Sequence, residues 1–306
     1  MTQTWLKVPE MTHEEWLMWR KQGIGGSDAP AIMGVSPWST PLQKWEEKVF
    51  DGPEKKSWIL NKGHFKEKQA RMEFEDLVGV RMLPVNIQNT KETWLRASLD
   101  GICPNGDKIV EIKYTGKDDH LVALSNKIPD KYYPQCQHIL KVTGKDGMYY
   151  FSSPEDGAPG KIVEVARDDQ YIDQLLTPKE VEFWNYVISN KAPPLTERDY
   201  ICMERSRKWK ETSQKWKETT KALKDLENQE SQIRADLIAL SKNHNARGNN
   251  LSLSKSIVQG RIDYITAFED YVANLKAHYP DIDFKPISLD PYRKESFVKW
   301  TLRDIS

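Results

Sequence analysis

The sequence predicts an α/β (α+β) fold, because long helix-forming segments alternate with short strand-forming runs. A segment rich in helix formers, from Ser57 to Arg81, precedes two apolar runs that flank a Pro-Asn-Gly-Asp turn. Another helix-forming segment, two more strand-like runs and a further helix follow before residue 190. This order of elements is typical of a central mixed β-sheet flanked by helices.

The composition is that of a folded protein without an overall charge bias. The 306 residues include 45 Lys+Arg and 45 Asp+Glu, so the formal net charge is zero. A charged partner would have to be recognised by a local patch of charge. The 11 Trp, 12 Tyr and 8 Phe argue against disorder. The three cysteines lack a C-x-x-C pair, which fits a reducing compartment. No signal peptide and no run of roughly 18 apolar residues is present, so we expect a cytoplasmic protein without a membrane span.

The N-terminal region carries three helix starts. Thr12 and Glu15 have the spacing of a capping box. The Gly-Gly-Ser-Asp turn at residues 25–28 offers an N-cap for a second short helix. Thr40 followed by Pro41 predicts a third, with proline at its first helical position.

The middle of the chain predicts a β-hairpin followed by further elements of both kinds. Trp94–Ile102 and Lys108–Tyr114 are strand-like, and the turn between them favours a hairpin. The further elements are a helix, two strands and a helix, at residues 131–142, 147–151, 161–166 and 168–190. An Ala-Pro-Pro motif at residues 192–194 marks the expected boundary between a domain of residues 1–194 and a C-terminal extension of residues 195–306.

The C-terminal extension is expected to begin with a long basic helix or a helical hairpin. Apolar residues recur every seven positions in two rows, which are Trp209, Trp216, Leu223 and Leu237, and Leu226, Ile233 and Leu240. Between Arg205 and Lys224, 8 Lys or Arg stand against 2 Glu, a local net charge of +6. Short strands at residues 251–264 and 297–302 and a helix near residues 267–278 are expected to follow.

Asp100, Glu111 and Lys113 form the strongest chemical pattern. In a hairpin, Glu111 and Lys113 lie on one face, and strand pairing can bring Asp100 beside them. Two carboxylates suit Mg²⁺ or Mn²⁺, and an amine beside them can orient or activate a water for attack on phosphorus. The pattern therefore predicts metal-assisted phosphodiester hydrolysis, and the structural alternative is a cross-strand ion pair.

Three further motifs accompany this pattern along the chain. Glu67 and Arg71 are one helical turn apart on the first long helix. Gln135 and Gln137 stand at the start of the helix after the hairpin. The sequence Arg-Lys-Gln-Gly-Ile-Gly-Gly-Ser-Asp at residues 20–28 is followed by Ser-Pro-Trp. Taken alone, each motif has a structural alternative, such as a surface ion pair or a helix cap.

In this order the motifs resemble those of the lambda-type phage exonucleases, the YqaJ-like viral recombinase family of the PD-(D/E)xK nuclease superfamily. The resemblance covers roughly residues 15–155 and implies a PD-(D/E)xK restriction-endonuclease-like core. One departure is visible, because Leu99 stands where the superfamily has the proline of its name. Since that proline only shapes the strand, the departure changes little.

The resemblance also implies a role for each matching residue at the catalytic centre. Asp100, Glu111 and the backbone carbonyl of Ile112 would hold Mg²⁺, and Mn²⁺ would substitute for it. Lys113 would position or activate the attacking water. Glu67 would lie beside the metal, as a ligand of a second metal or through a water.

Other residues would contact the nucleic acid. The resemblance implies that Gln135 contacts the site or the scissile strand, and that Arg20 and Ser27 hold a terminal 5′-phosphate. The basic segment of the C-terminal extension supplies three candidates for contact with DNA or with a partner, Lys215, Lys217 and Lys221. The alternative is that these lysines only form a solvated helix face.

The function implied by the resemblance is a Mg²⁺-dependent 5′-to-3′ exonuclease that acts on linear double-stranded DNA ends. Its product would be 3′ single strands for phage-type recombination, with a single-strand annealing protein as partner in the cytoplasm of a bacterial host. A homo-oligomer is implied, in the form of a ring-shaped trimer. The alternatives are a PD-(D/E)xK endonuclease, which would also cut closed circles, and a non-catalytic module that binds DNA ends.

Overall fold

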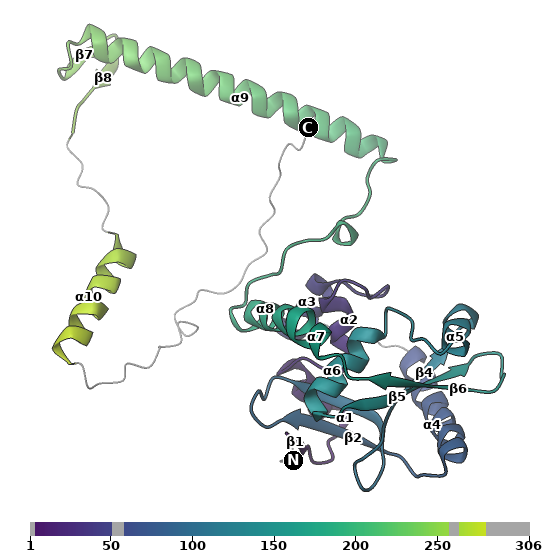
Figure 1. Ribbon diagram of the computed structural model, residues 1–306. Coiled ribbons are helices and arrows are strands. Elements are labelled where there is room, and N and C mark those ends of the chain that lie inside the picture. The colour runs from purple at the N-terminus through teal and green to yellow at the C-terminus, as the bar shows by residue number, and fades with distance from the viewer. Residues whose placement is uncertain (1–3, 51–57, 257–262, 280–306) are drawn as a thin grey trace. The chain divides into compact units, whose positions relative to one another are not determined.

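The computed structural model describes residues 4–50, 58–256 and 263–279, without the side chains of residues 58–65 and 264–265. The chain divides into two units, Met1–Ile201 and Cys202–Ser306, which are described separately here (Figure 1). The expected boundary after residue 194 lies slightly before this division.

The first unit is built on a six-stranded mixed sheet whose strands follow one another in chain order. The strands are β1 Trp5–Lys7, β2 Leu83–Asn89, β3 Arg96–Ile102, β4 Ile109–Thr115, β5 Gly147–Pro154 and β6 Lys161–Ala166. Neighbouring strands are antiparallel except for β4 and β5, which are parallel and connected through two helices. The prediction of a central mixed sheet flanked by helices is therefore confirmed.

The helices of this unit lie before, between and after the strands. They are α1 His13–Lys21, α2 Ala29–Ile32, α3 Pro41–Val49, α4 Trp58–Val78, α5 Lys117–Leu124, α6 Tyr133–Thr143, α7 Asp169–Tyr171 and α8 Thr177–Ile188. Two 3₁₀ helices, Gly26–Asp28 and Glu197–Asp199, and a π-helical segment, Ile172–Leu176, complete them. The single helix expected at residues 168–190 is thus divided by the π-helical segment.

The predicted starts of α1 and α3 are confirmed by their caps, whereas α2 begins after Asp28 without a side-chain cap hydrogen bond. Thr12 and Glu15 exchange hydrogen bonds between side chain and backbone at the start of α1. Thr40 caps α3, and Pro41 occupies the first helical position, where its missing N–H has no cost. The turn at residues 25–28 becomes the 3₁₀ helix Gly26–Asp28, which leads directly into α2.

Helices α4 and α6 cover opposite faces of the sheet, because alternate residues of β4 belong to different cores. Ile109 packs in a core that includes residues of α6, whereas Val110 and Ile112 pack in a core that includes Phe74 of α4. Glu111 and Lys113 follow the alternation of Ile109, and Gln135 of α6 contacts Glu111. The polar residues of β4 therefore lie on the α6 face.

In the first unit the predicted hairpin is present, whereas strands β1 and β2 and helix α5 are additional to the sequence prediction. Strands β3 and β4 are antiparallel, and Ile102 pairs with Ile109 next to the turn. Strand β2 contains a proline and two asparagines, which disfavour strands, although its Ile87 is fully buried. The tertiary burial of this strand overrides its weak local propensity. Strand β1 and helix α5 are too short to give a periodic signal.

The second unit begins with α9 Arg207–Leu240, one continuous helix and not a hairpin (Figure 1). A two-stranded hairpin follows, β7 Ala246–Gly248 and β8 Leu251–Leu253, and then α10 Tyr264–His278. Part of the expected strand region at residues 251–264 and the whole expected strand at residues 297–302 lie outside the described residues.

No helix in the described part of the chain is long and apolar enough to cross a membrane.

Candidate active site

The β3–β4 hairpin brings the acidic residues of the predicted site together. Asp100 lies on β3, and its Oδ2 accepts a hydrogen bond of 2.8 Å from the backbone N–H of Ile112 on β4. This bond fixes the Asp100 carboxylate against β4, beside Glu111. Lys113, two residues further along β4, donates a hydrogen bond from Nζ to Glu111 Oε1.

Helix α6 supplies the next residue of the site. Gln135 lies in the first turn of α6, and its Nε2 donates to Glu111 Oε1 at 2.5 Å. Pro134 occupies one of the first helical positions, which starts the helix where Gln135 faces the sheet. Glu111 Oε1 thus accepts two hydrogen bonds, one from the amide and one from the ammonium group.

The second oxygen of Glu111 has no partner among the described residues. Glu111 is only 1% exposed, and its Oε2 is buried without a hydrogen bond. An unsatisfied buried carboxylate oxygen is costly unless a cation or another donor completes it.

A metal ion fits this donor set. No group of three or more His, Cys, Asp or Glu side chains in the described residues is arranged to hold a metal. Mg²⁺, however, is commonly bound by one or two carboxylates and keeps several waters, so Asp100 and Glu111 Oε2 satisfy what it requires of side chains.

Burial raises the pKa of both carboxyls, and the charge of Asp100 raises that of Glu111 further. Burial, with the charge of Asp100, raises the pKa of Glu111 from 4.5 to about 8, against the opposing effect of Lys113. Burial also raises the pKa of Asp100. Burial alone would lower the pKa of Lys113, but the two carboxylates outweigh it and raise that pKa above its usual value. The lysine therefore carries its proton.

Glu67 and Arg71 lie at the edge of this group on α4. Arg71 Nη2 donates to Glu67 Oε1 at 2.7 Å, which is the ion pair expected from their spacing. The charge of Arg71 lowers the pKa of Asp100, and that of Glu67 raises the pKa of Glu111. Helix α4 thus adds charges of both signs beside the paired carboxyls.

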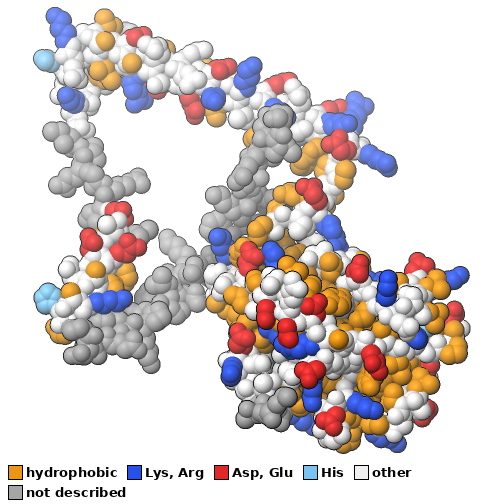
Figure 2. Space-filling view, viewed as in Figure 1, with side chains coloured by type: hydrophobic (Ala, Val, Ile, Leu, Met, Phe, Trp, Pro, Cys, Tyr) orange, Lys and Arg blue, Asp and Glu red, His pale blue; other side chains and the backbone are white. Residues whose placement is uncertain are grey.

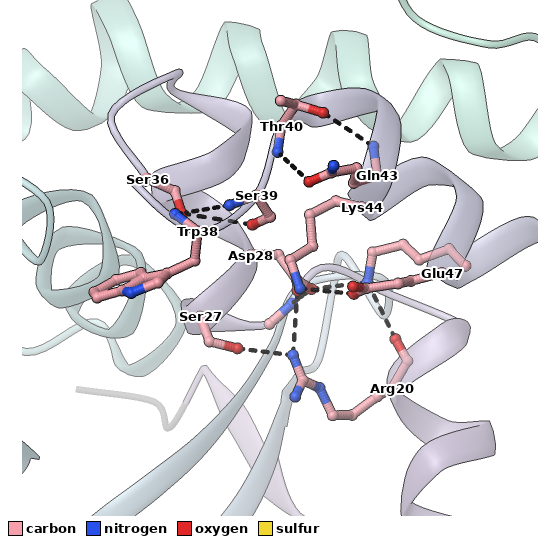
Figure 3. Close-up of polar contacts among 12 residues, drawn as sticks. Arg20, Ser27, Asp28, Ser36, Trp38, Ser39, Thr40, Gln43, Lys44 and Glu47 are labelled. Carbon is pink, nitrogen blue, oxygen red and sulfur yellow. Dashed lines mark hydrogen bonds and ion pairs between the residues drawn. The ribbon is translucent and has the colours of Figure 1, made fainter. Parts of the chain in front are cut away.

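Arg20 and Ser27 belong to a second polar cluster (Figure 3). Arg20 Nη2 donates to Ser27 Oγ at 2.7 Å and lies 3.2 Å from Asp28 Oδ1. Two lysines of α3 reach the same carboxylate, with Lys48 Nζ at 2.7 Å from Oδ2 and Lys44 Nζ at 4.0 Å from Oδ1.

Three cations therefore surround one buried carboxylate. Burial would raise the pKa of Asp28, but Lys48, Arg20 and Lys44 outweigh it and hold that pKa well below its usual range. Lys44 also pairs with Glu47 at 2.6 Å, so Asp28 and Glu47 neutralise two of the three positive charges, and a net charge of +1 remains beside the exposed Ser27. Such a set of donors matches a phosphate group.

The sequence prediction missed Asp28, Lys44 and Lys48 as members of this cluster. Lys44 and Lys48 are four residues apart on α3, so their common face was readable from the sequence. Their position beside Asp28 depends on the packing of α1, α2 and α3, for which the sequence carries no local signal.

Gly26 joins the two polar groups. A Cβ at this position would lie 3.4 Å from Cγ of Gln135 and 3.3 Å from Cγ1 of Ile139, so glycine lets the turn pack closely on α6. Ser27 therefore lies in the turn that contacts Gln135, the residue bound to Glu111. The predicted phosphate-binding residues and the predicted metal-binding residues are neighbours.

A row of aromatic rings leads outward from Lys113. Lys113 Nζ lies 5.4 Å from the ring centroid of Tyr132, and the Tyr132 ring lies 5.9 Å from that of Trp38. Lys131 Nζ is close to both rings. Trp38 is 64% exposed and belongs to the Ser-Pro-Trp motif, although the sequence alone gave it no role.

The lysines predicted to contact DNA or a partner are exposed on α9 and belong to the second unit: Lys215, Lys217 and Lys221.

Comparisons with known proteins show similarities of sequence and of fold. An uncharacterised protein YqaJ of Bacillus subtilis (strain 168) is 33% identical over 195 residues, which are 62% of this chain and 61% of that protein. The chain therefore spans about 61% of the length of this relative. Among solved structures, an alkaline exonuclease from Laribacter hongkongensis, LHK-Exo, has a similar fold, with a TM-score of 0.50 and 18% identity over 58% of this chain and 93% of that one.

At this identity the likeness to the solved structure concerns the fold. Residues 15–146 match the family described as the YqaJ-like viral recombinase domain, a range that contains every predicted site residue of the first unit. This part of the chain is therefore similar to a YqaJ-like viral recombinase domain.

Proposed function

We propose that the protein is a metal-dependent 5′-to-3′ exonuclease that degrades one strand of linear double-stranded DNA. The observation that carries the proposal is the buried, unpartnered Glu111 Oε2 beside Asp100 and Lys113. The ion pair with Lys113 satisfies Oε1 alone, so Oε2 needs a cation, or in the metal-free protein a proton shared with Asp100. The domain family and the fold similarity to an exonuclease support the same reaction class.

The chemistry follows from the donors at the site. Asp100, Glu111 and the backbone carbonyl of Ile112 would hold Mg²⁺ or Mn²⁺, with Glu67 beside them directly or through a water. When bound, the ion would act as a Lewis acid toward the phosphodiester. Lys113 would donate from Nζ to orient the attacking water, and its charge would stabilise the negative charge that develops on phosphorus-bound oxygens.

Gln135 would position the site. Its amide holds Glu111 Oε1, which leaves Oε2 to face the ion. Because Gln135 also packs on Gly26, it would connect the metal ligands with the Ser27 turn. The scissile strand would pass along this contact.

The direction of cleavage would come from the Arg20 cluster. A terminal 5′-phosphate carries up to two charges and three strong acceptor oxygens, for which the Arg20 guanidinium and the Ser27 hydroxyl are suitable donors. Lys44 and Lys48 would add positive charge behind them. Each cut exposes a new 5′-phosphate, so the same cluster would bind it again and draw the enzyme forward.

The proposal includes the assembly and the partner that the resemblance implies. The protein would act on DNA ends as a homo-oligomer, a ring-shaped trimer, in the cytoplasm of a bacterial host of a phage or prophage. A single-strand annealing protein would take up the 3′ strand.

The experiment compares three substrates: linear duplex with 5′-phosphate ends, linear duplex with 5′-hydroxyl ends, and covalently closed circular duplex. We expect mononucleotide release from the first in Mg²⁺, slower release from the second, no cutting of the third, and no reaction in EDTA. Arg20→Ala should remove the difference between the two linear substrates while Mg²⁺-dependent cleavage persists. Cutting of the closed circle would indicate an endonuclease, and binding of ends without any hydrolysis would indicate a non-catalytic module.

A further inference from the structure

Helix α9 has two apolar rows that no described residue of its own unit covers. None of its 34 residues is buried. Trp209, Leu226 and Ile233 are 51%, 61% and 59% exposed, and hydrophobic side chains lie open along the helix (Figure 2). A helix of this length with apolar rows at a seven-residue spacing is typical of a coiled coil, which requires a partner helix.

The two rows have a different composition in each half of the helix. The first row runs through Trp209, Trp216, Leu223, Glu230 and Leu237, and the second through Thr212, Thr219, Leu226, Ile233 and Leu240. Large aromatic and small polar residues thus alternate in the N-terminal half, whereas aliphatic residues predominate in the C-terminal half. Glu230 is the only charged residue in either row.

The halves of α9 also have opposite charges. Residues 207–224 contain 7 Lys or Arg and 2 Glu, whereas residues 225–240 contain 4 Asp or Glu and 1 Arg. One end of the helix is therefore basic and the other acidic. A partner that covers the whole helix has to be acidic at one end and basic at the other.

We propose that α9 pairs with α9 of a second copy of this chain as an antiparallel coiled coil. When the helices are aligned at their centres, each residue of one row lies opposite a residue of the other row. The opposed pairs are Trp209 with Leu240, Thr212 with Leu237, Trp216 with Ile233, Thr219 with Glu230, and Leu223 with Leu226. Two-fold symmetry repeats each pair.

This alignment matches residues by size and by polarity. Each tryptophan lies opposite an aliphatic residue, and Leu223 and Leu226 form the centre. Glu230, the charged residue of the rows, lies opposite Thr219, whose hydroxyl donates to the Lys215 carbonyl in the single helix and would turn to donate to Glu230 in the pair. The basic half of each helix lies along the acidic half of the other, and Lys215 falls close to the level of Asp236 of the partner.

A parallel pair would lose each of these matches. Glu230 would lie opposite the same glutamate of the second copy, and the two basic halves would repel each other along their whole length. Trp209 and Trp216 would each face their own copies. The antiparallel direction is therefore the one that the sequence of α9 favours.

The pairing leaves the other faces of α9 available. Lys217 and Lys221 lie outside both rows, so contact of these lysines with DNA is compatible with the pair. Because the apolar rows and the charges carry the inference, it stands independently of the nuclease proposal.

The test is cross-linking of cysteine variants of the full-length chain. Cys202 is exposed, whereas Cys103 and Cys136 are buried, so Cys202→Ser gives a suitable background. Thr212→Cys and Leu237→Cys are made as separate proteins, mixed, and treated with a short bis-maleimide. The matched control is a mixture of Gln214→Cys and Ala235→Cys, which lie at opposed levels but on the outer face.

We expect a covalent dimer in the Thr212→Cys and Leu237→Cys mixture, and at least tenfold less in each protein alone and in the control mixture. Cross-links within the separate Thr212→Cys or Leu237→Cys proteins would indicate a parallel pair and overturn the proposal. Absence of cross-links in every sample would also overturn it, because α9 would then be covered by α10, by the first unit or by another protein.

A second measurement uses assembly mass without cross-linker. Leu223→Asp with Leu226→Asp places four carboxylates at the centre of the proposed pair, whereas Gln214→Asp with Ala235→Asp adds the same charge on the outer face. In sedimentation velocity, the first double variant should halve the mass of the assembly, whether α9 joins two single chains or two of the proposed ring-shaped trimers, and the second should not. Equal masses of both variants and the wild type would contradict the pairing.

Discussion

Glu111 is the residue on which the account of the site depends most. Its raised pKa, due first to burial and then to Asp100, means that the folded protein without metal binds a proton more tightly than the unfolded chain does. The resulting contribution to stability is complete below pH 4.5 and is lost as the pH rises toward 8.

We therefore expect the free energy of unfolding in EDTA to fall across this pH range relative to that of Glu111→Gln, whose side chain does not titrate. Mg²⁺ should reverse the decline in the wild type only, because the ion binds the folded state. Urea denaturation at several pH values, with EDTA or Mg²⁺, measures both effects. Parallel pH profiles of the wild type and Glu111→Gln would show that the raised pKa is wrong.

Asp28 carries a corresponding structural role in the second cluster. Asp28→Asn would leave Lys48, whose side chain is only 5% exposed, without its countercharge. Removing one partner of a buried ion pair costs about 3–5 kcal/mol, so a large loss of stability is expected in urea denaturation. The matched control is Glu47→Gln, which breaks a partly exposed pair with Lys44 and should cost about 1 kcal/mol or less. Similar losses of unfolding free energy in the two variants would show that Asp28 does not belong to a buried network of ion pairs.

At the scale of elements, the contact between the Gly26–Asp28 turn and α6 connects the two clusters. Gly26→Ala would press a methyl group on Gln135 and Ile139 at 3.4 and 3.3 Å, and the neighbours would have to move by a few tenths of an ångström. We expect slower DNA hydrolysis with little loss of helicity, because Gln135 positions Glu111. Gly116→Ala is the control, since no atom lies within 4 Å of a Cβ there. Equal rates of DNA hydrolysis for both variants would show that the Gly26–Asp28 turn does not position the catalytic group.

The elements that the sequence predicts are those with strong local signals. The capping boxes of α1 and α3 and the hairpin turn at residues 104–107 depend on neighbouring residues, so they were readable without the fold. Strand β2 was not readable from the sequence, because its pairing with β3 and the burial of Ile87 come from the tertiary structure. The same distinction applies to the site: the hairpin places Asp100 beside Glu111, whereas the approach of Lys48 to Asp28 needs three packed helices.

At the scale of the whole molecule, α9 combines a proposed pairing surface with the predicted contact to DNA or a partner. If its lysines neutralise DNA phosphates, duplex binding should weaken steeply with salt. Changing Lys215, Lys217 and Lys221 to Gln should flatten the slope of log affinity against log salt, while changing them to Arg should preserve it. A titration of fluorescent duplex at several NaCl concentrations, in EDTA to prevent cleavage, measures the slope. An unchanged slope in the Gln variant would leave these lysines as a solvated face.

The central claim is that Asp100, Glu111 and Lys113 form a hydrolytic centre. The most direct measurement is the rate of nucleotide release from 5′-phosphorylated linear duplex by Lys113→Ala in Mg²⁺, compared with the wild type. The account predicts a loss on the order of 100-fold or more, because the group that orients the water is removed, with an unchanged circular dichroism spectrum and unimpaired duplex binding. A folded Lys113→Ala protein that releases nucleotides at nearly the wild-type rate would contradict the account.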